Sequence, residues 1–142
     1  VSYVLFTVSL KIINDLMHNK ARRLIYSTGL PPATVAASIA AINIIRTNKK
    51  LVKKPLENAV MFCKEAQLPI PQSSIVTLIL GTEKRTLKAS KIIQREGFYV
   101  GAIRPPTVPS NTSRLRFTFC ANHKKSEIIK LAKIIKNIRD II

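Results

Sequence analysis

The sequence contains few of the residues with which enzymes bind metals or form covalent intermediates. It has two cysteines and two histidines, Cys63, Cys120, His18 and His123, whose spacing matches neither a metal-ligand motif nor a disulfide framework. Its four glycines form no glycine-rich phosphate loop, and its seven acidic residues include no acid/base pair. The residues themselves therefore predict binding groups but no metal centre and no catalytic machinery. The low cysteine content favours a reduced, cytoplasmic protein.

Acidic residues are also scarce relative to basic ones. Twenty-four lysines and arginines against seven acids give a formal net charge of +17, which predicts attraction to nucleic acid or to an anionic surface. The basic residues are scattered, and aromatic residues, at 6% with no tryptophan, do not alternate with them as a base-stacking surface requires. Two interpretations stay open: solvated lysines on exposed faces, which we favour, or a basic nucleic-acid-binding module.

One long stretch lacks charge altogether. Residues 24–45 are 22 residues without a charged side chain, a length that could cross a bilayer. The pair Pro31-Pro32 shortens the helical part to about a dozen residues, a length typical of a buried helix. No basic region precedes the apolar residues 1–10, so we expect neither a secretory signal nor membrane insertion.

The hydrophobic pattern predicts two parts, 1–47 and 48–142, with a break at Asn48-Lys49-Lys50. The first contains a buried strand over 1–9, a helix over 11–20, a turn at 26–32 and a helix from Pro32 to about Thr47. A helix then carries Val52, Leu56, Ala59, Val60 and Cys63 on one face, with Pro55 in or near its first turn.

From Ile75 the expected order is strand, helix, strand, strand, helix. The elements are a strand over 75–80, a helix capped by Thr82 and ended by Gly97, strands at Phe98 and Arg114, and a helix over 125–141 that buries Ile128, Leu131, Ile135 and Ile138. This order predicts an α/β fold in which helices cover one face of a small sheet. Residues 1–47 are expected to be the end of a larger domain, because one strand and two helices cannot form a core alone.

The stretch over 97–119 carries the candidate binding residues. Three prolines in five residues form a stiff extended connector that presents Arg104 and Thr107. The strand that follows alternates Leu115, Phe117 and Phe119 with Arg114, Arg116 and Thr118, which places the aromatic set and the arginines on opposite faces. Because guanidinium binds carboxylate or phosphate bidentately, this stretch is a candidate anion site. From the residues alone, solvated arginines beside an ordinary turn are an equal alternative.

The same stretch resembles a known family. GAIRPPTVP over 101–109 and SRLRF over 113–117 are similar to the C-terminal region of the 8-amino-7-oxononanoate synthase family, a branch of the α-oxoamine synthases. ARRLIYSTGLPP over 21–32 resembles a second motif of that family, in the right order and at about the right distance. The resemblance covers essentially the whole chain. It implies the type I aminotransferase fold, with 1–47 as the end of the large cofactor-binding domain and 48–142 as the small C-terminal domain.

The resemblance also implies an activity and a set of site residues. Members of this family use pyridoxal 5'-phosphate to condense L-alanine with a pimeloyl thioester, with loss of CO2, in biotin biosynthesis, and they work as homodimers. By resemblance, Ser27 and Thr28 contact the cofactor phosphate, Arg116 binds the amino-acid carboxylate, and Arg104 and Thr107 lie near the acyl substrate.

The catalytic lysine of the family would fall a few residues before Val1. We therefore interpret the chain as the C-terminal portion of such an enzyme, from a split or truncated gene or part of a longer reading frame, and expect it to be inactive alone. A sister synthase that forms another aminoketone stays an alternative, although IRPPT over 103–107 favours the biotin-pathway member.

Overall fold

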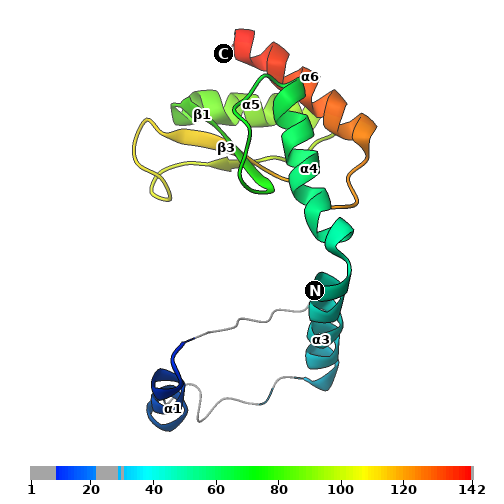
Figure 1. Ribbon diagram of the computed structural model, residues 1–142. Coiled ribbons are helices and arrows are strands. Elements are labelled where there is room, and N and C mark those ends of the chain that lie inside the picture. The colour runs from blue at the N-terminus through cyan, green and yellow to red at the C-terminus, as the bar shows by residue number, and fades with distance from the viewer. Residues whose placement is uncertain (1–8, 22–28, 30, 142) are drawn as a thin grey trace. The chain divides into compact units, whose positions relative to one another are not determined.

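The structure, a computed structural model, describes residues 9–21, 29 and 31–141 (Figure 1). The backbone divides into two compact units, Val1–Asn48 and Lys49–Ile142. The predicted strand at the N-terminus and the turn that contains Ser27 and Thr28 lie outside the described residues. The assignment of the two units to a large and a small domain stays a prediction.

The first unit contains helices α1 (Lys11–Lys20) and α3 (Pro32–Thr47). Both occur where the pattern predicts them, and Pro32 takes the first position of α3, where its missing N–H costs no hydrogen bond. Neither helix has a buried residue, and apolar side chains such as Ile12, Leu16 and Ile39 are exposed. No described helix is long and apolar enough to cross a membrane.

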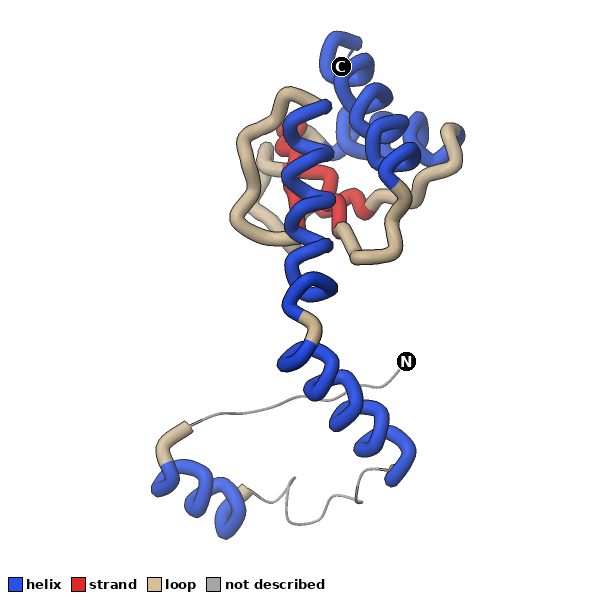
Figure 2. Tube along the Cα trace, turned by 45° about the vertical axis from the view of Figure 1, so that its right-hand side comes forward, coloured by secondary structure: helices blue, strands red, loops and turns tan. Residues whose placement is uncertain are grey.

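The second unit is a three-stranded antiparallel sheet with three helices. Its elements are α4 (Lys49–Glu65), β1 (Ile75–Gly81), α5 (Glu83–Arg95), β2 (Gly101–Ile103), β3 (Ser113–Thr118) and α6 (Lys125–Ile141). The strand order is β1-β3-β2, so β3 is central and pairs with both neighbours (Figures 1 and 2). The fold prediction, a small sheet covered by helices, is confirmed.

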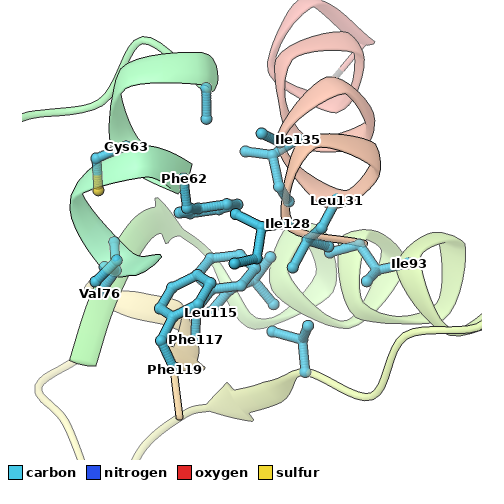
Figure 3. Packing of buried hydrophobic residues seen from close by; sticks show 14 of the residues in the cluster. Phe62, Cys63, Val76, Ile93, Leu115, Phe117, Phe119, Ile128, Leu131 and Ile135 are labelled. Atoms are coloured by element: carbon cyan, nitrogen blue, oxygen red, sulfur yellow. The ribbon is translucent and has the colours of Figure 1, made fainter. Parts of the chain in front are cut away.

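The core lies between the sheet and these helices (Figure 3). Phe62 of α4 is fully buried, and its ring centroid lies 4.9 Å from that of Phe117 and 5.1 Å from that of Phe119. As predicted, α6 buries Ile128, Leu131, Ile135 and Ile138. Burial also raises the pKa of the Cys63 thiol, because a thiolate would lose its solvation there.

Helix α4 differs from its prediction. It begins at Lys49, so the break is reduced to Asn48, and Pro55 lies just beyond the first turn, in the second. Val52 and Leu56, at the start of the predicted apolar face, are exposed, because the buried residues of α4 begin only at Asn58. The amide of Asn58 is itself buried and donates from Nδ2 to the carbonyl of Cys120 at 2.9 Å, which joins α4 to the segment after β3.

Strand β2 is shorter than predicted. Only 101–103 pair with β3, whereas the pattern predicts a strand from Phe98. The Ser90 hydroxyl of α5 donates to the carbonyl of Val100 at 3.1 Å, so this carbonyl is directed to the helix rather than to the sheet. The chain before Gly101 therefore diverges from β3.

Gly97 ends α5 in the left-handed region, with φ of 90°. Its N–H donates to Gln94 O, and Phe98 N–H donates to Ile93 O, the pair of bonds that defines a Schellman motif. We expect Gly97→Ala to lower the free energy of unfolding by about 1–2 kcal/mol through backbone strain alone, because an added Cβ would meet no atom within 4 Å. Urea unfolding would measure the change. The matched control is Gly101→Ala, which has no positive φ. An equal loss in both variants would contradict the explanation.

Candidate functional site

The sheet has an open face opposite the helices. The register places eight side-chain positions on it, Ile75, Thr77 and Ile79 of β1, Arg114, Arg116 and Thr118 of β3, and Gly101 and Ile103 of β2. Ile75 and Ile79 are 47% and 58% exposed, so no described element of the second unit covers this face. None of the eight positions is acidic, and the open face therefore has a positive potential that favours anions.

The two arginines on this face have different surroundings. Arg114 lies between Ile79 and Ile103 in the register, is half-buried, and donates from Nε to the carbonyl of Thr112 at 3.0 Å. Arg116 lies between Thr77 and Gly101 and is exposed. No hydrogen bond or ion pair joins the Arg116 guanidinium to the described residues, so its donors can bind a carboxylate bidentately.

The other two predicted residues lie in the hairpin loop between β2 and β3, residues 104–112. Arg104 and Thr107 are both exposed, and a backbone bond of 3.0 Å from Thr107 N to Arg104 O closes a turn between them. At the other end of the loop, the Thr112 hydroxyl donates to Pro109 O at 2.7 Å. The peptide bond between Pro105 and Pro106 is cis. The loop thus has a defined backbone while the side chains of Arg104 and Thr107 are exposed to solvent.

The hairpin brings Arg104, Thr107 and Arg116 into one supersecondary unit. Arg116 pairs with Gly101, and Arg104 follows Gly101 by three residues, roughly 10 Å along an extended strand. Ser27 and Thr28, the remaining predicted contacts, lie outside the described residues. No group of histidine, cysteine and acidic side chains in the described ranges could hold a metal ion.

A cavity of about 500 Å³ on the helix side of the sheet was not predicted. It lies where the chain before β2 diverges from β3, and its walls include Phe98, Phe117, Phe119 and Leu131. The ammonium of Lys130 donates to the carbonyl of Glu96 at 3.2 Å and lies 5.5 Å from the centroid of Phe98. The continuous strand expected from the apolar pattern would have closed this space, so the sequence carried no signal for it.

Comparisons with known proteins define the class. Residues 4–135 match the model of the aminotransferase class I and II family, and the chain belongs to that family. Two curated relatives point to one branch of it. The chain is 52% identical, over 86% of its length, to a putative 8-amino-7-oxononanoate synthase of Parvibaculum lavamentivorans. It is 46% identical, over 88% of its length, to the 8-amino-7-oxononanoate synthase of Beijerinckia indica.

These matches confirm the resemblance inferred from the two motifs. The chain spans about a third of the length of its relatives, 31% and 32% for the two proteins named.

Solved structures of the same fold have low sequence identity. Sphingomonas wittichii serine palmitoyltransferase matches with a TM-score of 0.83 and 19% identity, over 94% of this chain and 35% of that one. The 8-amino-7-oxononanoate synthase of Francisella tularensis matches with a TM-score of 0.76 and 20% identity, over 94% and 40%. Both support the fold.

Proposed function

We propose that this chain forms the substrate-carboxylate side of an 8-amino-7-oxononanoate synthase active site. The complete enzyme would condense L-alanine with a pimeloyl thioester and release CO2 and the free thiol. The observation that carries the proposal is Arg116, an exposed arginine with no partner among the described residues, on a sheet face without acidic side chains. The two curated relatives that the chain matches are named for this activity.

Each site residue has a role that suits its chemistry. The planar guanidinium of Arg116 would hold the carboxylate of L-alanine in one orientation through two parallel hydrogen bonds. The guanidinium of Arg104 and the hydroxyl of Thr107, presented by the loop, would contact the acyl substrate. Because these two residues and Arg116 belong to one hairpin, the amino acid and the acyl group would be oriented by the same structural unit.

Pyridoxal 5'-phosphate would supply the electron sink for this reaction. Its phosphate needs hydroxyl and amide donors, and Ser27 and Thr28 are the residues of this chain proposed to provide them. Its ring nitrogen needs an acidic partner, and the open face carries guanidinium groups but no carboxylate. The described residues therefore fit the substrate end of such a site rather than the cofactor ring. A homodimeric complete enzyme and a cytoplasmic location belong to the same proposal.

A chimera tests this function. The matching third of the Parvibaculum lavamentivorans relative is replaced by this chain, and formation of the aminoketone from L-alanine and pimeloyl thioester is measured. We expect product from the chimera and none from the 142-residue chain alone, because the chain spans only about a third of its relatives' length. A folded chimera that shows cofactor absorbance but forms no product would overturn the proposal.

A further inference from the structure

Gly101 is a glycine that the backbone does not require. Its φ is not positive, and a Cβ added there would meet nothing closer than the carbonyl oxygen of Arg116 at 3.9 Å, an ordinary van der Waals distance. Glycine inside a strand weakens the strand, and it often marks a place where a ligand or another backbone comes close. Neither conformation nor packing within the described residues explains why this position lacks a side chain.

The register shows where the missing side chain would stand. Gly101 pairs with Arg116, so its Cβ would project from the open face directly beside the root of the Arg116 side chain. In the adjacent row, Arg114 has an isoleucine on each side, Ile79 and Ile103. Isoleucine side chains thus flank Arg114, the arginine that is bonded to the loop, on both sides. Arg116, which has no partner among the described residues, has no side chain beside it on β2.

We propose that Gly101 is a specificity-determining residue for the carboxylate ligand of Arg116. The α-carbon of an amino acid lies about 1.5 Å from its carboxylate carbon, so a residue that borders the guanidinium also borders the α-substituents of a bound ligand. The space at Gly101 admits an α-amino acid with a small side chain, and a larger residue there would exclude it while sparing a carboxylate without substituents. This inference rests on the proposed carboxylate role of Arg116.

The test uses the 142-residue chain and two probes, formate and L-alanine. Binding is followed by NMR at the Nε–H of Arg116, whose signal is identified by its absence in Arg116→Lys. In Gly101→Leu we expect the Kd for L-alanine to rise about tenfold or more, with the Kd for formate changed less than about threefold. The melting temperature should not fall, because leucine has a higher strand propensity than the glycine it replaces. Gly101→Ala should give an intermediate Kd for L-alanine.

Thr77→Val is the matched control, because it changes the other neighbour of Arg116 without adding volume. Both affinities should be retained in it. Unchanged L-alanine binding in Gly101→Leu would overturn the role of Gly101 and leave that of Arg116 intact. Loss of both probes together with a lower melting temperature would show a purely structural role and also overturn it. If neither probe perturbs Arg116 in the unmodified chain, the proposed carboxylate site itself fails, and this inference with it.

Discussion

Phe62→Ala is expected to lower the free energy of unfolding by about 3–5 kcal/mol, a large part of the stability of a domain of this size. Phe62 is fully buried and contacts two further aromatic rings, that of Phe117 on the central strand and that of Phe119 directly after it. Its removal would leave a cavity between α4 and the sheet, in addition to the lost transfer free energy. Urea unfolding followed by circular dichroism would measure the effect.

The matched control is another aromatic residue of the same unit. Tyr99 is 91% exposed, so Tyr99→Ala should change the free energy of unfolding by no more than about 0.5 kcal/mol. A loss below about 1 kcal/mol for Phe62→Ala would show that the aromatic cluster is not the centre of the core.

Arg116→Ala in the active chimera is expected to raise KM for L-alanine about 10- to 150-fold, the equivalent of about 1.5–3 kcal/mol for a hydrogen-bonded charged group. KM for the pimeloyl thioester should change much less, because the proposal assigns Arg116 to the amino-acid carboxylate alone. Steady-state kinetics with each substrate varied in turn would separate the two constants.

Arg114→Ala provides the control for charge. It removes the same charge from the same strand and face, but Arg114 is bonded to the carbonyl of Thr112 and lies between two isoleucines. We expect it to reduce stability and to leave KM for L-alanine nearly unchanged. Equal increases in KM for the two variants would mean that the face acts through its total charge and has no defined carboxylate site.

Most of the second unit could be predicted because the apolar residues of its elements recur with a clear helical or strand periodicity. The apolar residues of α6 recur every three or four positions, and β3 alternates strictly, so both buried faces were assigned correctly. The errors have tertiary causes. Val52 and Leu56 fit the apolar stripe of α4 but precede the part of the helix that contacts the core. The strand predicted from Phe98 begins only at Gly101, and the carbonyl of Val100 accepts a hydrogen bond from Ser90 of α5.

The site shows a similar limit. Arg104, Thr107 and Arg116 could be predicted as binding residues because they belong to a recognisable motif, and the alternation of β3 separates its arginines from the core. What distinguishes Arg116 from Arg114 is their neighbours on β1 and β2, which only the strand register supplies. Gly101 was not predicted as a site residue, because the effect of its missing side chain depends on the residue paired with it, Arg116, which only the register shows.

The β2–β3 hairpin has a consequence for the evolution and engineering of substrate choice. Arg104, Thr107 and Arg116 lie within thirteen consecutive residues, and Gly101 precedes Arg104 by three positions. A single recombination of this short segment would therefore exchange the proposed contacts to both substrates at once. Such an exchange would keep the helical layer and Phe62 unchanged. The hairpin is in this sense a transferable module, in which Leu115 is the fully buried hydrophobic residue that would be exchanged together with the proposed contacts.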